Sequence, residues 1–140
     1  MAHGVEAPAA RSAAGKDASG QITVTVAQSG NEVAVELADD GAGLDLGRIR
    51  QRAIERQLIA PDAQPAAAEL QQMIFAPGFS TAETVTELAG RGVGLDVVRA
   101  EVNAMGGRTE VGSEPGRGTR FRLLLPLTTA VTQVVMLRCG

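Results

Sequence analysis

The sequence predicts an α+β fold, a two-layer sandwich in which helices lie on one face of a mixed, mostly antiparallel sheet. Two pairs of alternating apolar segments, each joined by a glycine-containing turn, indicate a β-hairpin toward each end of the chain. Between the hairpins, apolar residues recur at helical spacing. The chain has 140 residues, 44% of them apolar, which suits one domain with a core, or one domain with part of a second. Its only aromatic residues are three Phe, so we expect aliphatic side chains to fill the core.

The first hairpin is expected to follow a loop. Residues 1–20 are small, polar and interrupted by proline and glycine, which predicts irregular structure. Residues 22–26 and 33–37 alternate between apolar and other side chains, and the Ser29-Gly30-Asn31 turn joins them. We therefore expect two antiparallel strands with one buried face.

Helices are expected in the middle of the chain. Residues 45–58 carry an amphipathic pattern, and Asp45 stands where an N-cap would stabilise the first turn. A shorter helix is expected over 66–74. Another is expected over 93–105, where Gly106-Gly107 ends it.

The rest of the chain contains a long connection and the second hairpin. Apolar periodicity fails over residues 76–91, and connections of this length often serve as lids or binding loops. Strands at 108–113 and 119–126 flank a Pro-Gly-Arg-Gly turn. Residues 128–140 look like the first strand of a following domain, so we divide the chain into domains at 1–127 and 128–140.

Charge and cysteine content exclude several classes of function. The net charge of −3 argues against a surface that coats DNA or RNA. The single cysteine, Cys139, cannot form an internal disulfide, and one His with one Cys excludes a metal site of these residues, which suits a reducing cytoplasm. No apolar run approaches the roughly 20 residues that cross a bilayer, so we expect no membrane insertion.

Three glycine-rich segments together suit a pocket for an adenine ring with a polyphosphate tail. In the first, Asp39-Asp40-Gly41-Ala42-Gly43, the Asp39 carboxylate suits a hydrogen bond from an exocyclic amine such as adenine N6. Gly41 and Gly43 would let the backbone approach the ring. The alternative is a strand-to-helix turn with an acidic cap. We interpret Asp40 as a solvated neighbour or a cap.

The second and third segments would complete the pocket. Gly90-Arg91-Gly92-Val93-Gly94 leads into a helix, where free backbone N–H groups suit phosphate. The alternative is a structural loop. In Gly116-Arg117-Gly118-Thr119, the Thr119 hydroxyl could bond Asp39 or an adenine nitrogen, or Thr119 could be an ordinary strand residue.

Isolated cations and the histidine give weaker signals. Arg48 and Arg52 share a helix face, from which they could reach phosphate oxygens or form a solvated basic surface. Lys16 is interpreted as an exposed cation with little specific signal. His3, the only histidine, could contact phosphate, act as a general base or accept a phosphoryl group, and a pocket contact is favoured among these roles.

In these segments the chain resembles the ATP-binding domain of CheA-type histidine kinases, within the gyrase/Hsp90/histidine kinase/MutL ATPase superfamily. The first and third glycine segments are similar to glycine boxes of that family, and residues 90–98 to another. Residues 75–81 are similar to the phenylalanine box beside the lid. Leu125-Pro126-Leu127-Thr128 resembles the junction with a CheW-like coupling domain, and residues 130–133 resemble CheA-like kinases of type IV pilus systems.

The resemblance implies a Bergerat-type fold with an ATP lid, and ATP with Mg²⁺ as cofactors. Asp39 would contact adenine with support from Thr119, while Phe75 and Phe79 would anchor the lid. The ATP-binding residues that it implies are Asp39, Gly41, Gly43, Arg48, Arg52, Phe79, Ser80, Thr81, Gly90, Arg91, Gly92, Val93, Gly94, Leu95 and Thr119, with His3 near the phosphates.

The same resemblance implies an Asn that holds Mg²⁺ and precedes His3 by four positions, where this sequence has only two residues. We therefore expect that Asn, its helix, the phosphoacceptor domain and the dimerisation helices to lie outside this sequence, which itself would supply no metal ligand. We also expect an apolar patch on one side of the core. Without the metal-positioning group, the chain alone would have little or no kinase activity.

Within a longer protein, the resemblance implies transfer of the ATP γ-phosphoryl group to a histidine on a separate phosphotransfer domain, in chemotaxis or motility signalling. The implied partners are the phosphotransfer and dimerisation domains of the same protein, a CheW-like adaptor with its receptors, and a response regulator, all in the cytoplasm. Two alternatives remain: a non-catalytic nucleotide-binding or interaction module, and another ATPase of the superfamily.

Overall fold

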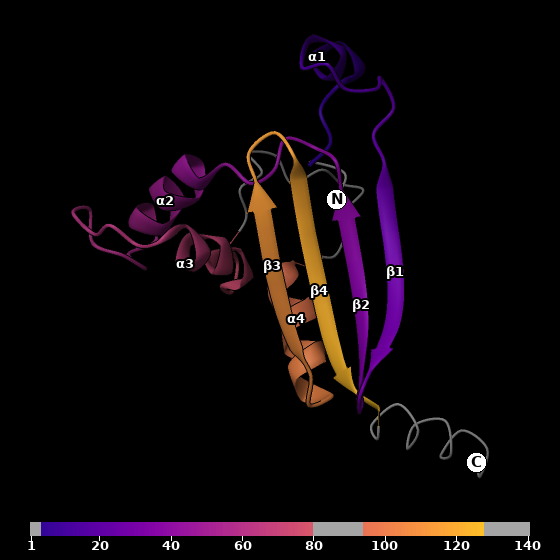
Figure 1. Ribbon diagram of the computed structural model, residues 1–140. Coiled ribbons are helices and arrows are strands. Elements are labelled where there is room, and N and C mark those ends of the chain that lie inside the picture. Colours follow the sequence, from indigo (N-terminus) through magenta and orange to yellow (C-terminus); the bar gives the residue numbers. More distant parts are fainter. Residues whose placement is uncertain (1–3, 80–93, 128–140) are drawn as a thin grey trace.

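The computed structural model describes residues 4–79 and 94–127, and Figure 1 shows how their helices and strands are arranged. The described elements follow the order α1, β1, β2, α2, α3, the 3₁₀ turn η1, α4, β3 and β4. Two antiparallel hairpins form one four-stranded sheet in the order β1-β2-β4-β3. Helix α4 packs against β3 and β4 on one face of this sheet. The predicted α+β class is therefore confirmed.

The first hairpin consists of β1 (Ile22–Ser29) and β2 (Glu32–Asp39). Ser29 lies opposite Glu32, so Gly30 and Asn31 form a two-residue turn. Gly30 has a φ of 60°, the left-handed conformation that tight hairpin turns require. The pairing places Asp39 at the end of β2, as the sequence predicted.

A six-residue helix, α1 (Pro8–Ala13), lies within the segment 1–20 that was predicted to be a loop, so that prediction was wrong there. Pro8 occupies the start of the helix, where its fixed φ suits the first turn and its missing N–H has no helical partner to lose. The helix is rich in alanine, which favours helix formation without producing an amphipathic pattern.

The second hairpin consists of β3 (Arg108–Glu114) and β4 (Gly118–Pro126). β4 pairs antiparallel with both β3 and β2, which joins the two hairpins. Glu114 lies opposite Gly118, and Ala38 lies opposite Arg120. The ends of β2 and β3 and the beginning of β4 therefore meet at one edge of the sheet.

The helices α2 (Leu46–Glu55) and α3 (Ala67–Gln72), with η1 (Met73–Phe75), lie beside β3, while α4 (Leu95–Ala104) runs behind β3 and β4 in Figure 1. The helix predicted over 45–58 ends earlier, at Glu55, because Gln57 has a φ of 59° and leaves the helical conformation. Gly106, with a φ of 75°, follows α4 as predicted.

The main core lies between these helices and the sheet. Phe121 of β4 packs against it, with its ring centroid 6.3 Å from that of Phe75 at an interplanar angle of 88°. Two of the buried members are aromatic, so the expectation of an aliphatic core was wrong for them. The buried members are Ile49, Ala53, Leu70, Ile74, Phe75 and Phe79.

The core-side face of β1 is not covered. Because Val24 pairs with Leu37 and Leu37 pairs with Phe121, these side chains lie on one face of the sheet. Yet every residue of β1 is exposed, with 61% exposure for Val24 and 66% for Val26. The predicted buried face of the first hairpin is therefore wrong for β1. The exposed side chains form the expected apolar patch.

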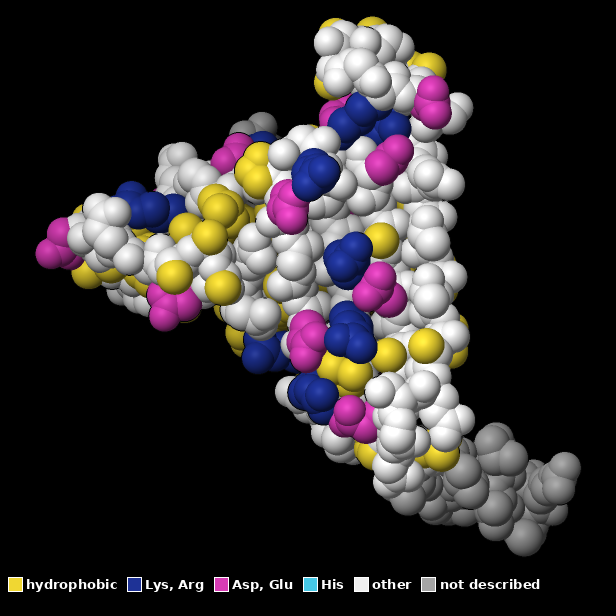
Figure 2. Space-filling model, in the orientation of Figure 1, with side chains coloured by type: hydrophobic (Ala, Val, Ile, Leu, Met, Phe, Trp, Pro, Cys, Tyr) yellow, Lys and Arg dark blue, Asp and Glu magenta, His cyan; other side chains and the backbone are white. Residues whose placement is uncertain are grey.

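The opposite face of the sheet is charged. Figure 2 shows basic and acidic side chains alternating over the strands on the side away from α4. The pairs include Arg108–Glu32 at 2.6 Å and Arg120–Glu36 at 3.2 Å. Because both signs alternate, this face presents no strong field of one charge. Such exposed pairs each add little stability.

Candidate functional site

Asp39 is the centre of the candidate site. It ends β2 and is only 8% exposed. Its Oδ1 accepts hydrogen bonds from the backbone N–H groups of Gly41, at 3.0 Å, and Thr119, at 3.2 Å. Within residues 4–79 and 94–127, no hydrogen bond reaches Oδ2. One carboxylate oxygen therefore fixes the side chain, and the other remains as an acceptor.

The backbone around Asp39 leaves no room for a side chain at two glycines. A methyl group on Gly41 would overlap the carbonyl oxygen of Gly4, which accepts a hydrogen bond from the Ala42 N–H at 3.1 Å. A methyl group on Gly118 would overlap the carbonyl oxygen of Asp39. These close approaches are the local reason why glycines flank the carboxylate. Gly43 has a φ of 82° and turns the chain toward α2.

Thr119 supports Asp39 through its backbone rather than its hydroxyl. The hydroxyl oxygen lies 3.2 Å from Ser113 Oγ, so the side-chain bond to Asp39, one of the two predicted options, is not formed. Ser113 Oγ accepts a hydrogen bond from the Leu44 N–H at 2.7 Å and lies 3.0 Å from the carbonyl oxygen of Gly118. Ser113 thus joins three segments of the site, and sequence analysis missed it.

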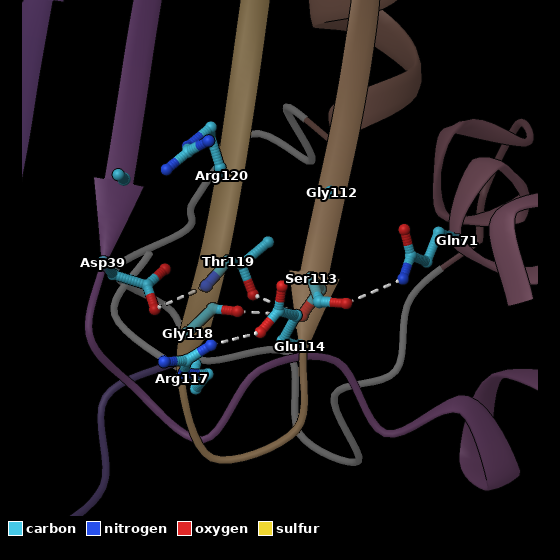
Figure 3. Close-up of a pocket in the computed structure, with 10 residues that line it drawn as sticks. Asp39, Gln71, Gly112, Ser113, Glu114, Arg117, Gly118, Thr119 and Arg120 are labelled. Atoms are coloured by element: carbon cyan, nitrogen blue, oxygen red, sulfur yellow. Dashed lines mark hydrogen bonds and ion pairs between the residues drawn. The ribbon is translucent and has the colours of Figure 1, made fainter.

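These groups line a pocket of about 490 Å³ at the sheet edge where β2, β3 and β4 meet (Figure 3). The volume lies within the range of about 300–1,000 Å³ that small-molecule sites usually have. Gln71 of α3 closes one side by donating a hydrogen bond from Nε2 to the Ser113 carbonyl oxygen at 2.9 Å. The lining residues are Ala38, Asp39, Gln71, Gly112, Ser113, Glu114, Arg117, Gly118, Thr119 and Arg120.

A charged network lies on the other side of the first glycine segment. Arg11 of α1 is fully buried, and its Nη2 donates to Asp40 Oδ2 at 2.7 Å. Lys16 is only 18% exposed at its side chain and donates to Glu6 and to the backbone of residues 40 and 41. The interpretation of Lys16 as an exposed cation was therefore wrong. The Asp40 side chain is 43% exposed, as expected of a solvated neighbour, but its pairing with Arg11 was not predicted.

Two carboxylates of this network have lowered pKa values. The hydrogen bond from Lys16 holds the pKa of Glu6 below its usual value, with smaller effects from nearby positive charge. The hydrogen bond from Arg11 does the same to the pKa of Asp40, assisted by the Gln21 N–H. Both groups therefore favour their ionised form, which keeps the network paired at neutral pH.

The segment before the predicted lid is anchored in the core. Phe79 is 8% exposed, and the Arg56 guanidinium carbon lies 6.0 Å from its ring centroid. The Phe79 N–H donates to the Ala76 carbonyl oxygen at 2.9 Å, which closes a turn around Pro77-Gly78. Gly94 is the N-cap of α4, and Leu95, its first residue, packs on the core. Several predicted site residues lie outside the described ranges: His3, Ser80, Thr81, Gly90, Arg91, Gly92 and Val93.

The two arginines predicted on the helix after the first glycine segment do lie on α2. Neither Arg48 nor Arg52 is among the residues that line the described pocket. Asp45 caps this helix as predicted, because its Oδ1 accepts a hydrogen bond from the Arg48 N–H at 3.0 Å. Of these predicted residues, Asp39 and Thr119 line the described pocket, whereas the two arginines do not. Gly41 and Gly43 lie next to Asp39 in the chain but are not among the lining residues either.

The described parts of the chain lack two further features. Across residues 4–79 and 94–127, no three His, Cys, Asp or Glu side chains converge as a metal site would need. Over the same residues, every helix is too short or too polar to span a bilayer.

Comparison with known proteins identifies the family of the chain. A family model described as histidine kinase-, DNA gyrase B-, and HSP90-like ATPase matches residues 5–129. The solved mycobacterial sensor histidine kinase MprB superposes with a TM-score of 0.50 and 20% identity, covering 76% of this chain and 59% of that one. At this identity the superposition supports the fold alone.

Curated relatives are more similar in sequence. The chemotaxis protein CheA of Rhizobium meliloti (strain 1021) is 46% identical over 129 residues, which cover 92% of this chain and 17% of the relative. The gliding motility regulatory protein of Myxococcus xanthus is 43% identical over 140 residues, which cover 99% of this chain and 18% of the relative. The chain therefore spans less than a fifth of the length of these two proteins.

Proposed function

The chain belongs to the histidine kinase-, DNA gyrase B- and HSP90-like ATPase family, as a CheA-like member, and we propose that it binds ATP with the adenine ring at Asp39. In this proposal Asp39 Oδ2 accepts a hydrogen bond from the N6 amine. Gly41 and Gly43 leave the backbone close to the ring. Thr119 holds the carboxylate in place through its N–H group.

The proposal rests on the difference in hydrogen bonding between the two carboxylate oxygens of Asp39. Asp39 is 8% exposed, and its Oδ2 is not among the buried side-chain atoms that lack a partner in the described part of the chain, so this oxygen reaches the surface. Here Oδ1 accepts two backbone N–H groups, while Oδ2 has no hydrogen-bond donor among the described residues and belongs to a side chain that lines the pocket. An amino group of a bound purine supplies the missing donor.

For the longer protein, we infer that this domain presents the γ-phosphoryl group of ATP to a histidine on a separate phosphotransfer domain. The names of the CheA relatives support this inference. A dimerisation domain, a CheW-like adaptor with receptors, and a response regulator complete the proposed cytoplasmic pathway for chemotaxis or motility. Arg48, Arg52, the second glycine segment and residues 79–81 are proposed to act near the phosphates when the lid closes.

Magnesium enters this proposal through the chemistry of phosphoryl transfer, in which the metal neutralises charge on the phosphates. We assign no residue of this chain to the metal. We propose that this chain recognises the purine and closes over the nucleotide. We expect the chain alone to have little or no kinase activity.

The test uses radiolabelled [γ-³²P]ATP with the full-length protein that contains this chain. We expect label on a histidine, recognised by its stability in alkali and loss in acid, and we expect Asp39→Asn to remove it. The isolated chain mixed with the phosphotransfer domain should give little transfer. Label that persists in full-length Asp39→Asn would contradict the proposed role of the carboxylate.

A further inference from the structure

We propose that Arg11 and Lys16 are positioning residues for nucleotide recognition, because they hold the peptide unit that orients Asp39. The inference rests on the proposed function, since it concerns how the adenine acceptor is aimed. Neither residue lines the pocket. Both act from the opposite side of the first glycine segment, from α1 and the turn that follows it.

The peptide unit between Asp40 and Gly41 connects the two sides. Its N–H, on Gly41, donates to Asp39 Oδ1 at 3.0 Å. Its carbonyl oxygen, on Asp40, accepts hydrogen bonds from Lys16 Nζ at 2.9 Å and from Arg11 Nη1 at 3.3 Å. Because the N–H and C=O of one planar peptide point in opposite directions, fixing the carbonyl aims the N–H at Asp39.

Lys16 also fixes the next peptide. Its Nζ donates to the Gly41 carbonyl oxygen at 2.8 Å and to Glu6 Oε1 at 2.9 Å. An ammonium group has three donors, and all three are therefore used within the protein. Lys16 has no donor left for a phosphate of the ligand, so its geometry suits positioning rather than direct contact.

Arg11 anchors this arrangement. The residue is fully buried, and every guanidinium nitrogen donates within the protein: Nε to the Asp17 carbonyl oxygen at 2.7 Å, Nη1 to Glu6 Oε2 and Nη2 to Asp40 Oδ2. The two cations face two carboxylates, Glu6 and Asp40, so the cluster has little net charge. Its contribution to nucleotide binding is therefore orientation rather than attraction of the phosphates.

Contacts from other residues are needed to fix the backbone of Gly41, because this residue has no side chain of its own. Glycine explores more backbone conformations than any other residue. A side chain cannot replace it, because a methyl group would overlap the Gly4 carbonyl oxygen. The two cations restrict the glycine from outside and leave the ring side of the segment free.

The test measures binding of ADP and GDP to the whole chain by isothermal titration calorimetry. Lys16→Met keeps the length of the side chain and removes the ammonium, while Lys16→Arg keeps donors for both carbonyl oxygens. We expect Lys16→Met to weaken ADP binding about tenfold, the scale of one hydrogen bond to a charged group, and to leave weak GDP binding unchanged. We expect Lys16→Arg to restore most of the preference for ADP.

Arg108→Met is the matched control. Arg108 is also a paired cation, bonded to Glu32, but it lies at the other end of the sheet, where β3 begins. We expect the Arg108→Met variant to bind both nucleotides as the unmodified chain does. The backbone amide signal of Gly41 in a ¹⁵N-correlated NMR spectrum should move in Lys16→Met and stay in place in Arg108→Met.

The outcomes separate this inference from the proposed function. If the unmodified chain discriminates ADP from GDP and Lys16→Met keeps the same ratio, the positioning role is wrong and the proposed function stands. Equal loss of ADP and GDP binding would overturn the inference, because it would indicate general structural damage. If the unmodified chain binds no ADP, the proposed function fails and the inference falls with it.

Discussion

Gly41 and Asp39 show how single residues determine the shape of the candidate site. Asp39 lies at the end of β2, where the strand pattern placed it. Its partner on β4 was predicted as a hydroxyl and is a backbone N–H, because a side-chain contact depends on rotamers that sequence spacing does not specify. The contacts of Arg11 and Lys16 with the first glycine segment escaped prediction because they join residues 24 to 29 positions apart in sequence, and no local pattern links them.

Gly41→Ala tests the tight contact with the N-terminal segment. The added methyl group would overlap the Gly4 carbonyl oxygen, so we expect a loss of about 1–3 kcal/mol in the free energy of unfolding. Urea unfolding followed by circular dichroism measures it. Gly112→Ala is the control, because a methyl group there meets nothing within 4 Å. Equal stability of the two variants would show that the close approach is absent in solution.

The helices and strands that were predicted well have strong periodicity. α2 and α4 present regular apolar positions, and both hairpins carry alternating segments around glycine turns. α1 was missed because six residues rich in alanine make no amphipathic pattern. The alternation in β1 predicted the strand correctly and its buried face wrongly, because burial depends on what packs against the strand.

The contribution of the α2 N-cap to stability can be tested by substituting Asp45. Asp45 accepts a hydrogen bond from the Arg48 N–H, so Asp45→Ala should destabilise the chain by about 1 kcal/mol. Asp45→Ser, which keeps an acceptor at the cap, should cost much less. Thermal unfolding compares the two variants. A cost for serine as large as that for alanine would argue against capping as the cause.

The packed core and the uncovered strand β1 should respond very differently to substitution. Ile49 of α2 is 1% exposed, so Ile49→Ala should cost about 2–5 kcal/mol of unfolding free energy. Val24 of β1 is 61% exposed, so Val24→Thr should change it by less than about 0.5 kcal/mol. Both values come from urea titrations of the chain. A large loss for Val24→Thr would mean that the apolar face of β1 is covered in solution.

The whole molecule combines a packed part, in which α2, α3 and α4 lie against the sheet, and an open edge, formed by β1. The charged network of α1 ties the N-terminal segment to the end of β2. The sequence predicted the two hairpins and the helices α2, α3 and α4, because their patterns are local. It did not predict this tie or the role of Ser113, which depend on contacts across the fold.

The charged network predicts that the stability of the folded chain depends on pH. The pKa values of Glu6 and Asp40 are lowered in the folded chain, so their contribution is fully present above their unfolded values, about 4 to 4.5, and is lost as the pH falls below them. We expect the urea midpoint to fall in this acidic range, and to fall less in Glu6→Gln. An unchanged acid response in Glu6→Gln would exclude Glu6 as a contributor.

Calorimetric titration of ADP into the unmodified chain and into Asp39→Asn decides whether this carboxylate recognises adenine. The asparagine keeps an oxygen for the N–H groups of Gly41 and Thr119, but it presents an amide donor to the N6 amine. We predict ADP binding that weakens about ten- to a hundredfold in the variant, while Asp45→Asn, which keeps its cap, binds as before. Equal ADP affinity in Asp39→Asn and the unmodified chain would contradict the proposed site.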